Sequence, residues 1–294
     1  MSARLAAIVL ILVVATFAHA ADASRFIVIG VDGMSPDGVI KADTPVMDKM
    51  MKDGAWTLHA RGVMPTSSSP NWASMIMGAG PEQHGITSNE WERDKFEIAP
   101  TAKSDEGFFP TIFGLIRKQH PTAIIGSIYD WDGFGRLTEK KSIDLDKDCD
   151  GPAETTDAAV AFIKEKKPTF LFVHLDHVDH VGHEVGHGTP EYYKSVEEAD
   201  TYIGQILQAV AEAGLADETD VLVTSDHGGV KKGHGGATMA EIEIPWILVG
   251  PGVAKGREVT APVNTYDTAA TIAHALGIPM HDAWIAKPVL SAFE

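Results

Sequence analysis

The feature that most constrains this chain is the alternation of short apolar runs with longer amphipathic segments. Runs rich in β-branched residues predict five buried strands, at 26–31, 123–128, 169–175, 220–224 and 244–249. The segments between them predict helices, several of which stop at glycine or proline, at 44–52, 70–77, 155–166 and 190–213. This alternation predicts an α/β fold, a three-layer α/β/α sandwich with a mostly parallel central sheet.

Acidic side chains follow three of the predicted strands at the point where each strand ends. Asp32 follows the first strand, Asp176 and Asp179 follow the third, and Asp226 follows the fourth. In an open parallel sheet, ligands bind beyond the carboxyl ends of the strands. One acid in such a place is usually a turn or cap residue, but three places with histidines beside two of them favour a binding site.

Histidines gather beside these acids. Of the thirteen in the chain, five lie between His174 and His187, and His227 and His234 follow them. Carboxylate and imidazole are ligands that zinc accepts at about 2.0–2.2 Å. The sequence therefore predicts a metal site, with zinc as the ion that suits the donors.

The register of one ligand pair is ambiguous. Asp179 and His183 are four residues apart, and Asp176 and His180 have the same spacing. Gly182 favours the later pair, because glycine permits the close backbone approach that a metal loop often needs.

A second ligand segment is Ser225-Asp226-His227-Gly228, an adjacent acid and imidazole on a glycine-containing loop, with His234 further along between two glycines. An Asp-His-Gly string is a weak signal alone and a strong one beside the other segments. His177 and His187 are expected to be solvated loop residues rather than ligands.

A candidate nucleophile lies among the hydroxyl residues of Thr66-Ser67-Ser68-Ser69-Pro70-Asn71, directly before a predicted helix. A helix start offers free N–H groups and a positive dipole end, which favour a phosphate anion. N-capping is the alternative interpretation, since serine and threonine cap helices routinely. The metal ligands favour the nucleophile.

The N-terminus has the features of an exported protein. Arg4 precedes an apolar run at 5–17 and then Ala18-His19-Ala20, which predicts a signal peptide over residues 1–20. The alternative, a membrane anchor, needs about 20 apolar residues. The mature chain, 21–294, is expected to form one catalytic domain without a membrane anchor, secreted or periplasmic.

Charge and cysteine content narrow the function classes further. The net charge of −17 argues against nucleic acid and anionic membrane surfaces as partners. Cys149 is the only cysteine, so no intramolecular disulfide is expected, and core packing or bound metal must stabilise the fold.

Taken in order, the motifs resemble those of the nucleotide pyrophosphatase/phosphodiesterase branch of the alkaline phosphatase superfamily. They are Val-Asp-Gly at 31–33, Pro-Thr-Ser-Ser-Ser-Pro-Asn at 65–71, Gly-Pro-Glu-Gln-His-Gly-Ile at 80–86, Asp-His-Val-Gly-His at 179–183, Ser-Asp-His-Gly at 225–228 and Gly-His-Gly at 233–235.

The resemblance implies an alkaline phosphatase-like fold and a set of roles. Ser68, two residues before Pro70, takes the place of the nucleophile, where that branch usually has threonine. Asn89 corresponds to an asparagine that donates to a phosphoryl oxygen, with backbone N–H groups near Asn71 assisting. The implied ligands of two zinc ions are Asp179, His183 and His234 for one, and Asp32, Asp226, His227 and the Ser68 oxygen for the other.

The activity implied is that of an exported two-zinc phosphoester hydrolase that forms a phosphoserine intermediate. A sulfatase is disfavoured, because Trp72 stands where sulfatases have arginine. The expected substrate is a small-molecule phosphate ester or pyrophosphate. The chain is shorter than nucleotide-cleaving relatives, which leaves nucleotide specificity open.

The class of ester depends on the charge of the expected substrate pocket. The segment Tyr129 to Phe134, expected to line the leaving-group pocket, contains aromatic residues, two acidic residues and no cation, and Arg136 is the nearest cation. Because a monoester dianion usually attracts an extra cation, a diester or pyrophosphate bond is favoured. A phosphomonoesterase is the alternative, and a non-catalytic zinc-binding protein is the third hypothesis.

Overall fold

The computed structural model describes residues 23–95 and 97–293, so the predicted signal peptide at 1–20 lies outside the described residues. The strands are β1 Arg25–Val31, β2 Ala55–Arg61, β3 Ile125–Tyr129, β4 Leu145–Asp148, β5 Phe170–Leu175, β6 Thr219–Thr224, β7 Glu243–Val249 and β8 Arg257–Glu258. The helices are α1 Pro36–Lys41, α2 Pro45–Asp53, α3 Ser68–Met77, α4 Pro81–His84, α5 Ile112–Gln119, α6 Asp132–Gly135, α7 Pro152–Lys166, α8 His177–Val185, α9 Pro190–Glu212, α10 Met239–Ile242 and α11 Asp267–Ala275.

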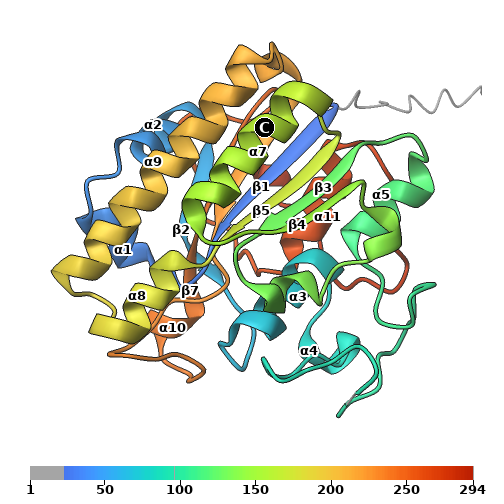
Figure 1. Ribbon diagram of the computed structural model, residues 1–294, viewed down its shortest axis with the longest axis horizontal. Helices are drawn as coiled ribbons and strands as arrows, with labels where there is room; N and C mark the ends of the chain where they lie inside the picture. Colours follow the sequence, from blue (N-terminus) through green and yellow to red (C-terminus); the bar gives the residue numbers. More distant parts are fainter. Residues whose placement is uncertain (1–22, 96, 294) are drawn as a thin grey trace, which may run out of the picture.

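These strands form one eight-stranded sheet in the order β4-β3-β5-β1-β6-β7-β2-β8 (Figure 1). The five strands from β4 to β6 are mutually parallel, whereas β7 runs antiparallel to both β6 and β2. The central strands β1, β5 and β6 are buried along nearly their whole length, which explains why they read as continuous apolar runs. Their carboxyl ends lie at one edge.

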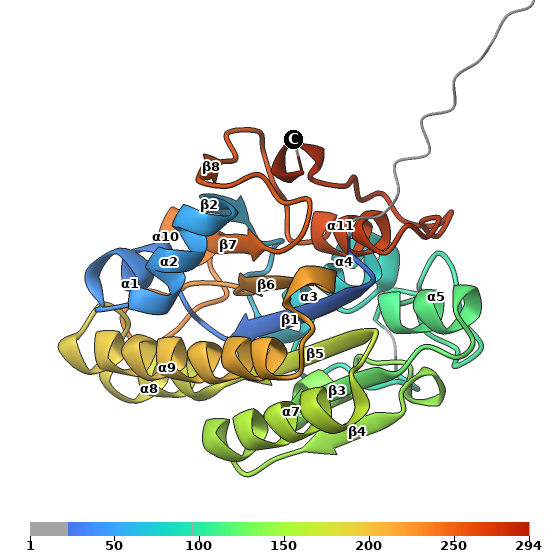
Figure 2. The same cartoon turned by 90° about the horizontal axis from the view of Figure 1, so that it is seen from above.

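Helices cover both faces of this sheet (Figure 2). One apolar core packs α1, α2, α7 and α9 against one face. The other core packs α3, α5 and α11 against the opposite face. The prediction of a three-layer α/β/α sandwich with a mostly parallel sheet is confirmed, and no helix in the described ranges is both long enough and apolar enough to cross a bilayer.

Three of the elements that sequence patterns did not predict are polar or short. β4 is an edge strand with alternating exposed charges, and β8 has only two residues. α8 carries three histidines in its nine residues, so its apolar stripe is interrupted. Each lacks the run of apolar residues on which strand and helix prediction depends.

Candidate active site

Three buried side chains meet where β1 and β6 end. Asp32 follows β1, Asp226 and His227 follow β6, and the parallel register pairs Gly30 with Thr224. These three residues, the inner cluster, are at most 1% exposed. Nε2 of His227 lies 3.3 Å from Oδ1 of Asp32 and 3.3 Å from Oδ2 of Asp226. Neither carboxylate oxygen has a hydrogen-bond partner in the described chain.

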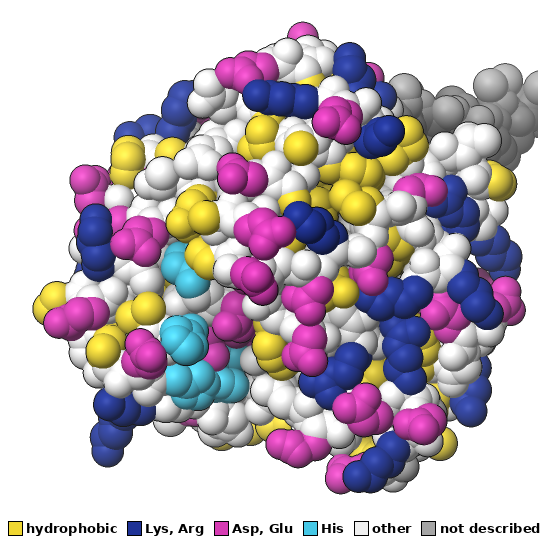
Figure 3. Space-filling model, viewed as in Figure 1, with side chains coloured by type: hydrophobic (Ala, Val, Ile, Leu, Met, Phe, Trp, Pro, Cys, Tyr) yellow, Lys and Arg dark blue, Asp and Glu magenta, His cyan; other side chains and the backbone are white. Residues whose placement is uncertain are grey.

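A second group, the outer cluster, consists of Asp179 and His183 of α8 and His234 of the loop after β6. Nε2 of His183 lies 3.1 Å from Oδ2 of Asp179 and 3.2 Å from Nε2 of His234. The rings of His227 and His234 stack at 3.7 Å, so the two clusters adjoin. Figure 3 shows histidines gathered beside acidic side chains on this face, near α8 and α10.

All three histidines are oriented in the same way by backbone carbonyls. Nδ1 of His227 lies 2.8 Å from Gly228 O, Nδ1 of His183 lies 3.0 Å from Lys232 O, and Nδ1 of His234 lies 2.8 Å from Thr66 O. A carbonyl can only accept, so each Nδ1 carries the hydrogen and each Nε2 keeps a lone pair. Orphaned carboxylate oxygens beside these lone pairs fit two metal ions with oxygen and nitrogen ligands.

The charges of the acids also call for cations. Burial raises the pKa of Asp226 well above its ordinary value, and the negative charges of Asp32 and Asp179 raise it further. In the described part of the chain, the ion-pair partners of these carboxylates are all histidines. A bound cation would offset both the cost of burying these charged carboxylates and the repulsion between them.

The structure brings Asp179 and His183 together and turns His180 away. The His180 side chain is 64% exposed and lies beside Glu184. The metal loop expected around Gly182 is wrong, because this segment is the helix α8, which places residues four apart on one face. Gly182 instead leaves room for the ring of His187, since a Cβ there would lie 2.5 Å from that ring.

The expectation that His177 and His187 are solvated is wrong. The His187 side chain is 3% exposed, packs between α8 and the loop at Gly229, and has Nε2 3.8 Å from Oδ1 of Asp179. His177 directs Nε2 at Ser195 O, 3.1 Å away. The long helix α9 covers a segment that the sequence presented as a loop.

Ser68 is the first residue of α3, and its Oγ lies 3.2 Å from Nε2 of His227. Thr66 is otherwise occupied, because its hydroxyl donates to Gly236 O and accepts from Gly235 N. Among the hydroxyl residues before Pro70, Ser68 is thus the one in hydrogen-bond contact with the inner cluster.

The amides of the first turn of α3 differ from expectation. Asn71 N donates to Ser67 O, so the expected free N–H groups near Asn71 are absent from the described structure. The Asn71 side chain instead ties together the loop before the helix, through Val63, Pro65 and Ser67. The amide of Ser68 has no acceptor among the described residues and remains available.

Asn89 lies beside the same helix start. Its Oδ1 accepts from Ser69 N at 2.8 Å, which leaves the Nδ2 group free for another partner. Arg136 donates to Asn89 O, Trp91 O and Glu92 Oε1. The guanidinium therefore supports the Asn89 segment, and the idea that it supplies a pocket cation is not favoured.

The prediction that Tyr129 to Phe134 line a leaving-group pocket is wrong. Tyr129 and Phe134 belong to the apolar core, and the carboxylate of Asp130 is 1% exposed. Asp132 is exposed and Trp131 is partly exposed. Strand β3 and helix α6 turn the other side chains of this segment inward.

Comparison with known proteins places this site in a family. A profile of the type I phosphodiesterase / nucleotide pyrophosphatase family matches residues 26–232. The chain belongs to this family. The match covers the inner cluster, Ser68, Asn89 and the Asp179 and His183 of the outer cluster, and it ends before His234.

Curated relatives of the chain have names from the same family. Ectonucleotide pyrophosphatase/phosphodiesterase family member 1 of Mus musculus is 26% identical over 194 residues, which are 63% of this chain and 21% of the relative. The bis(5'-adenosyl)-triphosphatase enpp4 of Mus musculus is 24% identical over 217 residues, 70% of this chain and 47% of the relative. The chain thus spans less than half the length of these relatives.

Solved structures share the fold at low sequence identity. Murine ectonucleotide pyrophosphatase/phosphodiesterase 5, an inactive variant in complex with AMP, superimposes with a TM-score of 0.72 at 17% identity, over 87% of this chain and 96% of that one. A 2-O GAG sulfatase matches with a TM-score of 0.72 at 15% identity, over 92% of this chain and 74% of that one. These likenesses confirm the alkaline phosphatase-like fold.

Sequence reasoning missed three residues behind the inner cluster of this family member. Nε1 of Trp72 lies 2.8 Å and Nε2 of His174 lies 3.1 Å from Oδ2 of Asp32, and Asp130 lies on the far side of His174. Burial would lower the pKa of His174, but Asp130 and Asp32 outweigh it and raise the pKa to about 9. A histidine inside the apolar strand 169–175 was the signal available.

Proposed function

We propose that this chain is an exported two-zinc phosphoester hydrolase, with Ser68 as its nucleophile, that acts on a diester or pyrophosphate bond. The observation that carries the proposal is the position of Ser68 Oγ, 3.2 Å from Nε2 of His227, in a cluster where one buried oxygen of each carboxylate lacks a hydrogen-bond partner. Membership of the phosphodiesterase / nucleotide pyrophosphatase family supports the same reaction class.

The two clusters would hold one zinc ion each. Asp32, Asp226 and His227, with Ser68, form one ligand set, and Asp179, His183 and His234 form the other. Bound there, zinc would supply Lewis-acid stabilisation of charge on the attacking and leaving oxygens. The number of donors matches two four-coordinate ions when Ser68 or water completes each set.

The chain itself positions the substrate and the nucleophile. The free amide of Ser68 and Nδ2 of Asn89 are donors at the start of α3, where the helix dipole also favours an anion. They would bind non-bridging phosphoryl oxygens and stabilise the charge that grows on them. Ser68 Oγ then forms a bond to phosphorus as one ester oxygen leaves with its group. The resulting phosphoserine still carries the second ester group, and water cleaves its Ser68 O–P bond to release the monoester.

The preference for a diester follows from the charges around the site. In the described part of the chain, no lysine or arginine forms an ion pair with the acids of either cluster, and Arg136 is engaged with the segment 89–92. A monoester dianion has one more negative charge to neutralise than a diester. A phosphomonoesterase on the same core is the alternative activity.

Export of the enzyme rests on the N-terminal sequence. The predicted leader at 1–20 has the charged, apolar and small-residue regions of a signal peptide. Curated relatives named ectonucleotide pyrophosphatase/phosphodiesterase are consistent with a secreted or periplasmic location.

Kinetics with two matched aryl esters test the proposed bond class. We expect bis-aryl phosphate to show a higher kcat/KM than the corresponding aryl phosphate monoester. A monoester preference of tenfold or more, about 1.4 kcal/mol of transition-state stabilisation, would make the chain a phosphatase. Zinc bound without turnover of either ester would favour the non-catalytic zinc-binding hypothesis.

A further inference from the structure

His174 lies between two buried carboxylates that come from neighbouring strands. The parallel register aligns His174 of β5 with Gly30 of β1 on one side and Tyr129 of β3 on the other. Asp32 and Asp130 follow those two strands, so they flank the imidazole. Nε2 of His174 lies 3.1 Å from Oδ2 of Asp32, and Nδ1 lies 3.6 Å from Oδ1 of Asp130.

The two oxygens of Asp32 have different surroundings. Oδ2 accepts from His174 and from the indole of Trp72, which packs over Gly30 where a Cβ would not fit. Oδ1 has no hydrogen-bond partner and lies 3.3 Å from Nε2 of His227. Rotation of the carboxylate would break both bonds to Oδ2, so the two donors fix which oxygen is offered to the inner cluster.

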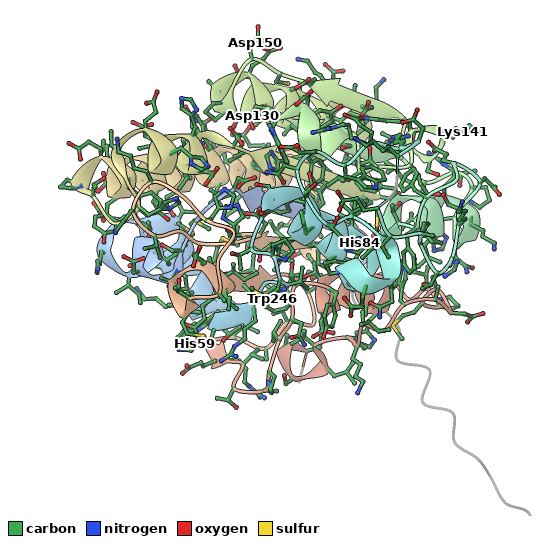
Figure 4. All side chains as sticks on the ribbon, turned by 90° about the horizontal axis from the view of Figure 1, so that it is seen from below. His59, His84, Asp130, Lys141, Asp150 and Trp246 are labelled. Atoms are coloured by element: carbon green, nitrogen blue, oxygen red, sulfur yellow. The ribbon has the colours of Figure 1, made fainter. Side chains whose placement is uncertain are left out.

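Asp130 in turn fixes the imidazole. Its side chain is 1% exposed, although a buried carboxylate is costly unless it is paired. Oδ1 of Asp130 also accepts from Asp176 N at 2.7 Å, at the residue that precedes α8. Figure 4 shows Asp130 inward of Asp150, which stands at the outer edge of the molecule. The carboxylate of Asp130 thus lies beside Nδ1 and orients the ring with Nε2 toward Asp32.

We propose that His174, oriented by Asp130, is a positioning residue for Asp32: it holds the carboxylate so that Oδ1 faces the metal pocket of the inner cluster. This inference rests on the proposed function of that cluster as a metal site. It concerns the inner cluster alone, because the acid of the outer cluster is held by different side chains.

A purely structural role makes a different prediction. The ring of His174 stacks on Phe134 at 5.1 Å and meets the edge of Trp72 at 4.9 Å, so an apolar side chain would fill much of the same space. If packing were the only role, His174→Leu would change stability without changing metal affinity selectively.

The test measures zinc affinity by chelator competition on the full chain. In a His183→Ala background the remaining ion reports the inner cluster, and in a His227→Ala background it reports the outer one. We expect His174→Leu to weaken the inner site about 10- to 100-fold, the usual effect of removing a residue that orients a metal ligand. The outer site should keep its affinity.

Conservative variants separate orientation from packing. His174→Gln keeps an N–H donor near Asp32 and should recover most of the affinity, whereas Asp130→Asn should show a smaller loss than His174→Leu. The matched control is His177→Gln, the same change at a histidine that faces Ser195 O, and it should have no effect on zinc. His174→Leu should also add nothing in an Asp32→Asn background.

Each outcome decides the inference. If the His174 variants keep the wild-type zinc affinity at both sites, or weaken both sites equally, the positioning role is overturned. Two zinc ions bound to the wild-type protein would then still support the proposed function. A wild-type protein that binds no zinc would overturn the metal centre itself. If His174→Leu fails to fold, Asp130→Asn gives the same comparison between the two sites, with a smaller expected loss at the inner one.

Discussion

The inner and outer clusters offer similar donors in different settings. The inner acids Asp32 and Asp226 follow central strands, and the whole cluster is at most 1% exposed. In the outer cluster, the side chain of His183 is 47% exposed and that of Asp179 is 10% exposed. The outer donors come from a short helix and a loop, whereas the inner ones are fixed by the sheet. The central sheet therefore fixes the positions of the inner donors, whereas a short helix and a loop fix those of the outer donors.

The largest effect should come from Ser68, the proposed nucleophile, which contacts the inner cluster. Ser68→Ala removes the hydroxyl and should lower kcat by about 10³-fold or more, because removing a covalent nucleophile costs on this scale. The fold and the outer zinc should be retained. Steady-state kinetics checks the rate, with Ser67→Ala as the control that changes the neighbouring N-cap residue and causes a much smaller loss. An unchanged rate in Ser68→Ala would exclude the assigned register.

The next effect sharpens the contrast in exposure. His183→Ala removes one of three outer donors and should lower the affinity for one zinc by more than the roughly 10- to 100-fold that loss of a ligand-orienting residue costs. The unfolding temperature of the metal-free protein should stay nearly unchanged, because the side chain is half exposed. Metal analysis after dialysis against a chelator measures the loss. The control is His180→Ala, on the same helix but facing Glu184, and a comparable loss in that variant would contradict the assignment.

The smallest effect concerns the stability of the metal-free inner cluster. Burial and the charges of Asp32 and Asp179 raise the pKa of Asp226, so the metal-free protein takes up a proton there on folding. Stability contributed by this group therefore falls as pH rises from the unfolded pKa of about 4 through the higher folded value. Asp226→Asn should remove this decline, because the amide carries no charge.

At neutral pH the metal-free Asp226→Asn protein should be more stable than metal-free wild type by on the order of 1 kcal/mol, or roughly 2–4 °C in Tm. Added zinc should reverse the ranking, since it stabilises the wild type more. Thermal unfolding with and without chelator makes the comparison. A metal-free variant less stable than wild type would show that Asp226 is not strained by its neighbours.

Sequence patterns predicted the central strands well because those strands are buried on both faces. The predicted strand 26–31 is β1 within one residue, and 220–224 is β6 within one residue. The meeting of Asp32 and Asp226 followed from the parallel topology, since both come directly after such strands. Local sequence patterns were therefore enough to predict that the acids of the inner cluster meet.

The other features of the site depend on contacts between residues far apart in the sequence, which local sequence patterns do not reveal. Three features depend on contacts between separate elements. Tyr129 and Phe134 pack into the apolar core, α9 covers His177, and Asp130 pairs with His174. The register of Asp179 and His183 was open in the sequence, because the overlapping pair had equal spacing, and it needed the helical geometry of α8.

The most direct test of the proposed mechanism is to trap its covalent intermediate on Ser68. The enzyme is mixed with a bis-aryl phosphate, quenched in acid after a few milliseconds to seconds, digested and mapped by mass spectrometry. We predict one aryl-phosphoryl group on Ser68, which is in hydrogen-bond contact with His227, and none in the Ser68→Ala variant. An adduct on Thr66, Ser67 or Ser69, or turnover without any adduct on Ser68, would contradict it.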